Sequence, residues 1–233
     1  MGWFFCLWKF FSINYCANTK IKFFKNRIVN QIQYILLKIL ILNFKYQFMA
    51  LTESYMLPLE TKAPDFSLPN VIDGKFKSLN EIKGLKGTLI IFMCNHCPYV
   101  IHLLNGILNT SKDFQKKEIN TIAISSNSIK THPQDGPEEM EIFAKNNSFS
   151  FPYLFDETQE VAKNYQAACT PDFYLFDKNL ELYYRGRFDS SRPGNNLPVT
   201  GEDIHKAAEL MLLKLSYNQK QYPSMGCNIK WND

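Results

Sequence analysis

Two cysteines, Cys94 and Cys97, stand three residues apart in the segment IIFMCNHCPYV, where a run of β-branched and aromatic residues ends. Pro98 follows the second cysteine directly. Thiols at this spacing serve thiol–disulfide chemistry, through a thiolate and a neighbouring resolving thiol, or they form half of a zinc-type metal site. A third alternative is a pair of inert core residues, because buried cysteine is common.

The elements expected around this pair favour redox chemistry. The apolar run over 88–93 predicts a buried strand, and Pro98 suits the first turn of a helix. A helix N-terminus carries partial positive charge and free N–H groups, which stabilise a thiolate placed there. We therefore expect Cys97 to be the nucleophile and Cys94 to resolve its product. His96 would lower the pKa of Cys97 further if protonated, or else would face solvent.

Metal binding stays open as an alternative, because Cys94 and Cys97 supply only part of a ligand set. Cys169 and His96 would have to complete a zinc site. In a copper-handling protein, one of the four histidines would have to join the pair: His96, His102, His132 or His205. The sequence gives no basis for assigning a metal ligand or a cofactor. A non-catalytic binding module is the remaining alternative.

The order of the predicted elements indicates one α/β domain with a mixed central sheet covered by helices on both faces. Asp73-Gly74 predicts a hairpin turn, and Asp135 is expected to start a helix. The tail over 216–233 shows no evident element. The remaining predicted elements are a strand over 119–126, an extended segment over 151–156, a short helix over 157–165, a hairpin from 172–177 and 180–188, and a helix over 202–215.

Residues 1–48 differ in charge from the rest of the chain, since they contain seven basic residues and no acid. Acidic residues slightly outnumber basic ones in the remainder, which gives no sign of a nucleic-acid-binding surface. We interpret this extension as the product of a misplaced start, with Met49 as the true start, or as a targeting or membrane-associated segment. Its apolar stretch over 35–42 is short against the roughly 20 residues of a membrane span. The domain itself is expected over 58–215.

Six cysteines in 233 residues do not make the dense disulfide framework of a small secreted protein. A reducing, cytoplasmic compartment is therefore expected. Membrane association or organelle targeting would apply if the extension is genuine.

Taken together, the segments APDF, CNHCPYV and CTPDFYLFD resemble the thioredoxin-like superfamily. Within it, the resemblance is to the peroxiredoxin-like branch related to alkyl hydroperoxide reductase and thiol-specific antioxidant, in the group that carries CNHCP with YRGRFD, SRPG and PSMGCNIKW. It covers about residues 61–215 and implies a thioredoxin-like fold. It also implies a cis Thr170-Pro171 bond that faces Cys97 and holds the substrate chain beside it.

The same resemblance makes Cys97 the nucleophile, but this chain departs from the pattern of peroxiredoxins, which have a Pro where this chain has Ile90. Cys94 occupies the position of their Thr, and no Arg stands near Asp172, which leaves Arg185 or Arg187 as a substitute. The expected function is thus oxidoreduction of disulfides, and less so of peroxides, by an antioxidant-type enzyme. Expected partners are protein thiols or disulfides, or a small peroxide, and a reductant such as a thioredoxin. Cys169, Cys227 and His96 are candidate accessory residues.

Overall fold

The computed structural model describes residues 51–232 and, before them, Gln33 alone. The expected extension over 1–48 lies outside the described residues, apart from that one position. The described domain belongs to a compact unit that runs from residue 50 to residue 233. Within the described part of the chain, no helix is both long and apolar enough to cross a membrane.

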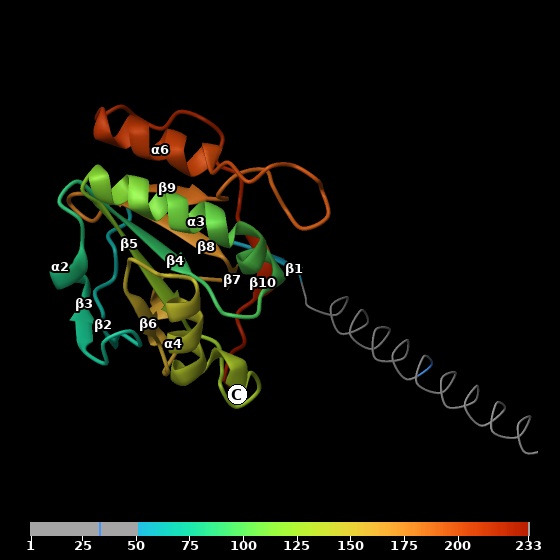
Figure 1. Cartoon of the computed structure of the whole chain (residues 1–233). Coiled ribbons are helices and arrows are strands. Elements are labelled where there is room, and N and C mark those ends of the chain that lie inside the picture. The colour runs from blue at the N-terminus through green and yellow to red at the C-terminus, as the bar shows by residue number, and fades with distance from the viewer. Residues whose placement is uncertain (1–32, 34–50, 233) are drawn as a thin grey trace, which may run out of the picture. The chain divides into compact units, whose positions relative to one another are not determined.

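A five-stranded sheet in the order β6-β5-β4-β8-β9 forms the centre of the domain (Figure 1). β4 pairs in parallel with β5 and antiparallel with β8, so the sheet is mixed, as predicted. β5 and β6 are parallel, whereas β8 and β9 form the predicted hairpin. The strands span Gly87–Phe92 (β4), Ile119–Ser125 (β5), Tyr153–Phe155 (β6), Asp172–Asp177 (β8) and Leu182–Gly186 (β9).

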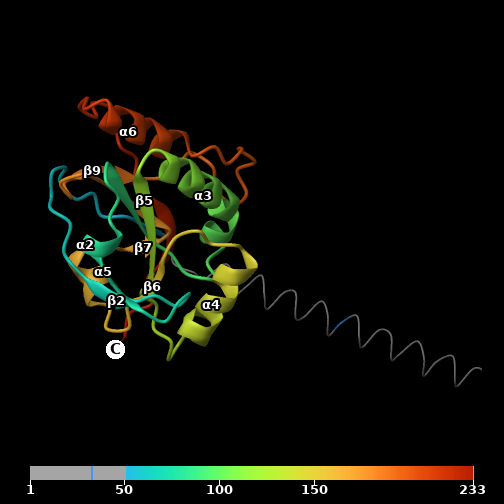
Figure 2. The ribbon, with the colours of Figure 1, turned by 60° about the vertical axis from the view of Figure 1, so that its left-hand side comes forward.

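Helices cover both faces of this sheet (Figures 1 and 2). α3 and α6 lie side by side on one face, where Thr110 of α3 is hydrogen-bonded to His205 of α6 at 3.0 Å. α2 and α5, with the β2–β3 hairpin, flank the other side of the sheet. The bounds are Pro98–Lys116 (α3), Glu202–Leu212 (α6), Leu79–Ile82 (α2), Glu160–Asn164 (α5), Pro137–Asn146 (α4), Pro133–Asp135 (the 3-10 turn η1), Ser67–Pro69 (β2) and Phe76–Ser78 (β3).

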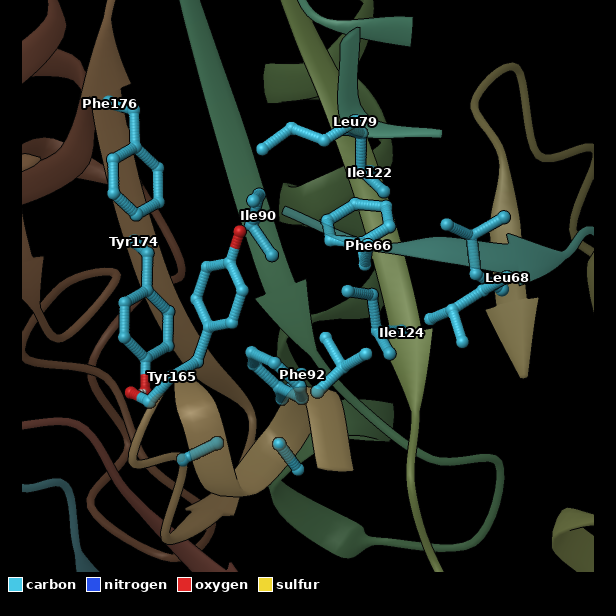
Figure 3. Close-up of a cluster of buried hydrophobic side chains, with 14 of the residues drawn as sticks. Phe66, Leu68, Leu79, Ile90, Phe92, Ile122, Ile124, Tyr165, Tyr174 and Phe176 are labelled. Atoms are coloured by element: carbon cyan, nitrogen blue, oxygen red, sulfur yellow. Dashed lines mark hydrogen bonds between the residues drawn. The ribbon is translucent and has the colours of Figure 1, made fainter. Parts of the chain in front are cut away.

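An aromatic cluster fixes the end of β4 from which the cysteine loop departs (Figure 3). Phe92, the last residue of β4, packs against Tyr165 with ring centroids 5.6 Å apart and against Tyr174 at 5.7 Å. Full burial of one such side chain stabilises a fold by roughly 1.5–3 kcal/mol. The first residue of the cysteine loop therefore starts from a rigid point.

A second, three-stranded sheet corrects the prediction for the C-terminal tail. β10 (Met225–Asn228) lies between β1 (Leu51–Glu53) and β7 (Cys169–Thr170), and it is antiparallel to both. The domain thus includes chain on both sides of the expected 58–215 range. The segment MGCN lacks the polar–apolar alternation of a typical strand. It pairs with strands far away in the sequence, so no local pattern predicts it.

Candidate active site

Cys97 is the N-cap residue of α3, with Pro98 in the first turn, as the sequence predicts. Its side chain is 0% exposed. The backbone carbonyl of Cys97 accepts a hydrogen bond from the N–H of Ile101 at 3.0 Å, which closes the first turn. The sulfur consequently lies at the positive end of the helix dipole.

The loop of Thr170 and Pro171 lies against this sulfur. The Thr170-Pro171 bond is cis, which confirms that prediction. The carbonyl oxygen of Thr170 is 3.0 Å from Sγ of Cys97, and its hydroxyl is 3.5 Å from Sγ of Cys94. Both thiols of the Cys-x-x-Cys pair therefore contact the same residue.

Cys227 of β10 supplies the shortest sulfur contact of the site. Its Sγ lies 2.9 Å from Sγ of Cys97. The register of the second sheet sets this approach, because Cys227 lies opposite Thr170. The sequence suggested Cys227 only as an accessory thiol, whereas the structure brings it into direct contact with the expected nucleophile.

The surroundings of Cys97 act on its pKa in opposite directions. Burial alone would raise the pKa of the thiol, but hydrogen bonds from Cys227, Cys94, Thr170 and the backbone N–H of Val100 outweigh it. The Thr170 carbonyl, an acceptor, favours the protonated form, yet it is a single acceptor against several donors. The net effect holds the pKa of Cys97 well below the usual range of a thiol.

The same contacts keep the other two thiols protonated. The hydrogen bond to Cys97 raises the pKa of Cys94 first, followed by burial and the negative charge of Asp135. The pKa of Cys227 is likewise raised, first by its hydrogen bond to Cys97 and then by burial. Of the three neighbouring thiols, Cys97 is therefore the one that ionises, and Cys94 and Cys227 stabilise its negative charge.

Asp135 is a site residue that the sequence analysis missed. It was expected to start a helix, but Gly136 caps α4 and the Asp135 side chain turns towards the cysteine loop. Its Oδ1 accepts a hydrogen bond from the N–H of Asn95 at 3.0 Å, and its Oδ2 accepts one from Asn127 at 2.9 Å. The signal for it was topological: β4 and β5 are parallel, so the loops after them meet at one edge of the sheet.

The side chain of His96 lies next to the carboxylate of Asp135. Its Nδ1 lies 2.8 Å from Oδ2 of Asp135, and its ring stacks on that of His132 with centroids 5.2 Å apart. The ligand atoms of Cys94, His96 and Asp135 all lie within 4.8 Å of one another. This group could hold a metal ion of the kind that takes sulfur, nitrogen and oxygen ligands.

Two of the other histidines considered as metal ligands, His102 and His205, are engaged elsewhere. His102 is hydrogen-bonded to Ser191 at 2.8 Å, and His205 to Thr110. Cys169 is buried, with its Sγ 3.7 Å from the carbonyl oxygen of Pro171, and burial raises its pKa. In the described residues no hydrogen bond joins Cys169 to the Cys97 thiol, although the charge of Cys97 adds to the raised pKa of Cys169.

Neither arginine proposed as a peroxide-polarising substitute is free. Arg185 is fully buried and donates to Asp172 at 3.2 Å, directly after Pro171 in the sequence. Arg187 donates to Asp203 at 2.6 Å and lies over the ring of Tyr222. Both guanidinium groups therefore have a carboxylate partner of their own.

The space beside the cis-proline is small. A small, partly open cavity of about 20 Å³ is lined by residues that include Tyr99, Pro171, Arg192 and Met225. That volume suits one water molecule.

Comparisons with known proteins place this geometry in context. The profile of the AhpC/TSA family matches residues 59–185. The crystal structure of an uncharacterized conserved protein from Geobacillus kaustophilus is 48% identical, with a TM-score of 0.77, and the match covers 79% of this chain and 97% of that one. A hypothetical protein from Sinorhizobium meliloti is 39% identical, with a TM-score of 0.75 and coverage of 78% and 98%.

A more distant structure bears on the fold alone. The thioredoxin domain of a thiol-disulfide oxidoreductase from Bacteroides vulgatus has a TM-score of 0.51 at 18% identity, and the match covers 65% of this chain and 98% of that domain. This likeness confirms the predicted thioredoxin-like fold. A search of curated proteins found no match to this chain.

Proposed function

This chain belongs to the AhpC/TSA family of thioredoxin-like proteins, and from that membership we propose that it is a thiol–disulfide oxidoreductase with Cys97 as its nucleophile. The observation that carries the proposal is the set of donors around one sulfur. Cys97 caps α3 and is surrounded by the thiols of Cys94 and Cys227 and by Thr170. A thiolate, not a thiol, is the species that attacks a disulfide.

In the proposed reaction, the Cys97 thiolate attacks one sulfur of a substrate disulfide and releases the other as a thiolate. Cys94 then attacks Sγ of Cys97 in the mixed disulfide, expels the second substrate thiolate and forms the Cys94–Cys97 disulfide. Cys94 is held protonated mainly by its hydrogen bond to Cys97. Once Cys97 is in a disulfide it bears no charge, so the pKa of Cys94 falls at the step that needs its thiolate.

His96 and Asp135 are the proposed proton acceptor for Cys94. Their ligand atoms lie within 4.8 Å of its sulfur, and the two side chains are 2.8 Å apart. A histidine beside a carboxylate is a suitable proton acceptor once the donor thiol is within reach. Thr170 and Pro171 are the proposed substrate-binding residues, and a thioredoxin is the proposed reductant.

Disulfides are the proposed substrates rather than peroxides. Cys94 stands where peroxiredoxins have a hydroxyl donor, and Arg185 and Arg187 are paired with Asp172 and Asp203. Because the charge of each guanidinium is already paired with a carboxylate, the developing charge on a peroxide oxygen lacks a dedicated cationic partner. The low pKa of Cys97 also favours chemistry over a purely structural binding module.

The test compares the two reactions in one preparation. We expect reduction of a small disulfide to be faster than reduction of hydrogen peroxide or cumene hydroperoxide. Cys97→Ser should abolish disulfide reduction, whereas Cys169→Ser, a matched change at a thiol without a hydrogen bond to Cys97, should retain it. Peroxide reduction at the rate of an efficient peroxidase, or activity that survives Cys97→Ser, would refute the proposal.

Metal binding is a second candidate, because Cys94, His96 and Asp135 bring three ligand atoms together. A sulfur, a nitrogen and an oxygen ligand with one open position suit Zn²⁺, and the thiolate also suits Cu⁺. The test is elemental analysis of reduced protein after incubation with each metal and removal of the excess. One bound metal per chain, lost in His96→Ala and retained in His132→Ala, would favour this candidate.

A further inference from the structure

We propose that Cys227 is a third redox thiol of this site, which β10 holds in place to form a disulfide with Cys97. The inference rests on the proposed function, because it requires Cys97 to be the nucleophile. The two sulfur atoms lie 2.9 Å apart. A disulfide bond is about 2.05 Å long, so a shift of about 1 Å brings them to bonding distance.

The position of Cys227 in β10 is fixed by the strands on both sides of it, β1 and β7. Cys227 lies opposite Leu51 of β1 and opposite Thr170 of β7. Gly226 allows the close approach, since a Cβ at that position would overlap the carbonyl oxygen of Thr170. That carbonyl also contacts Sγ of Cys97. Cys227 is therefore a thiol that the fold directs at the nucleophile and not an unattached tail residue.

The position of Cys227 also closes the site. Cys97, Cys94 and Cys227 are 0%, 1% and 3% exposed. An attacked disulfide must place one sulfur beside Sγ of Cys97, and Sγ of Cys227 already occupies such a position. The Thr170 backbone, proposed above to bind substrate, is paired with β10. An external substrate and β10 consequently compete for the same contacts, and β10 must shift before an external disulfide reaches Cys97.

The chemistry balances as an ordinary exchange. The Cys97 thiolate attacks a small disulfide R–S–S–R, which forms a Cys97–S–S–R mixed disulfide and releases R–S⁻. Cys227 gives up its proton to solvent and attacks Sγ of Cys97, which forms the Cys97–Cys227 bond and expels the second R–S⁻. The protein loses two electrons, and R–S–S–R gains them. Cys94 can then attack Cys97, which frees Cys227 and converts the product to the Cys94–Cys97 disulfide.

The experiment uses the full chain and equimolar dithiobis(nitrobenzoate), whose released thiolate absorbs visible light. The background variant carries serine at the three cysteines outside the proposal: Cys6, Cys16 and Cys169. Cys94→Ser is added to remove the other resolving thiol, and a matched variant carries Cys94→Ser with Cys227→Ser. The measurements are the thiolate released and the intact mass of the protein, which shows whether the aromatic adduct remains.

We expect the Cys94→Ser variant to release both thiolates and to lose the adduct, whereas the matched variant stops after the first thiolate and keeps it. An adduct that persists in Cys94→Ser would overturn the role of Cys227 and leave Cys97 as the nucleophile. First-thiolate release that survives Cys97→Ser would overturn the proposed function itself. Peptide mapping of the oxidised Cys94→Ser variant tests the bond itself: a Cys97–Cys227 linked peptide is expected, and its absence at every time point would refute the proposal.

Discussion

The carboxylate of Asp135 accepts a hydrogen bond from the backbone N–H of Asn95, 40 residues earlier in the chain, at 3.0 Å. This contact ties the 3-10 turn after β5 to the loop between the two cysteines. Asn95 is held a second time, because its side-chain oxygen accepts a hydrogen bond from the hydroxyl of Tyr153 at 2.9 Å. The spacing of Cys94 and Cys97 is thus set by buried polar contacts as well as by the helix cap.

We expect Asp135→Asn to lower the free energy of unfolding by roughly 1–3 kcal/mol, the range for a buried polar group left without a partner. The new amide group would direct an N–H at Asn127 or Asn95, each of which already donates. Chemical denaturation measures the effect. Glu139→Gln, an equivalent charge change at an exposed position of α4, is the control. Equal stability of the two variants would contradict the role assigned to Asp135.

The thiolate of Cys97 should titrate at higher pH in Cys227→Ala. The Cys227 thiol is a donor that lowers the pKa of Cys97, so its removal raises that pKa. The measurement is the ultraviolet thiolate absorbance as a function of pH, with Cys97→Ser to assign the transition. Cys169→Ala, which removes a thiol without a hydrogen bond to Cys97, should shift the transition less. An unchanged transition in Cys227→Ala would show that Cys227 does not stabilise the thiolate.

Local sequence patterns were sufficient to predict the parts of the site that consist of residues adjacent in the sequence. The buried strand, Cys97 and Pro98 form one strand–turn–helix segment, and each neighbour carries its own signal. The cis bond before Pro171 was expected only from the resemblance to the thioredoxin-like superfamily, because a Thr-Pro pair by itself also fits an ordinary loop. The domain fold followed from strands and helices whose hydrophobic patterns are strong.

Long-range contacts account for what the sequence did not reveal. Cys227 reaches Cys97 across 130 residues through strand pairing of MGCN, which has weak strand propensity. Asp135 had a sufficient local explanation as a helix start, so its contact with Asn95 went unexpected. Arg185 and Asp172 pair across the β8–β9 hairpin. Charged residues are usually expected at the surface, so the sequence did not predict that both are buried.

Asp172 should make the stability of the protein depend on pH between about 4 and 6. Burial raises the pKa of Asp172 to about 6, although Arg185 acts to lower it. A pKa raised in the folded state contributes stability that is complete below the unfolded pKa, near 4, and is lost as the pH rises through 6. Relative to Asp172→Asn, the wild-type protein should thus lose roughly 3 kcal/mol over this range. Urea unfolding at several pH values measures this difference, and a constant difference would contradict the raised pKa.

The same pair permits a check at neutral pH. Arg185→Met leaves the buried carboxylate of Asp172 without its guanidinium partner, and removal of one partner of a buried pair costs about 3–5 kcal/mol. Replacing both residues, as Asp172→Asn with Arg185→Met, should recover much of the loss. If the double variant is as unstable as the sum of the single ones, the two side chains do not interact.

The last prediction concerns β1, the strand that pairs with the outer edge of β10. A chain that begins at Met49 retains β1 and should keep both its cooperative unfolding and the reactivity of Cys97. A chain that begins at Leu57 lacks β1 and also Ser54, whose N–H donates to the carbonyl oxygen of Ser224 at 2.9 Å. β10 then becomes an edge strand that is paired on one side only, so it opens more often.

Alkylation of Cys227 under native conditions, followed by mass spectrometry, measures that opening. Cys227 should be labelled at least about tenfold faster in the shorter chain, which corresponds to a loss of about 1.4 kcal/mol in the free energy of opening. Cys94 is the internal control, because it is buried and follows β4, the central strand of the five-stranded sheet. Faster labelling of both cysteines would indicate general unfolding. Equal labelling of Cys227 in the two chains would mean that β1 does not hold β10, and that the contact between Cys227 and Cys97 depends on β7 alone.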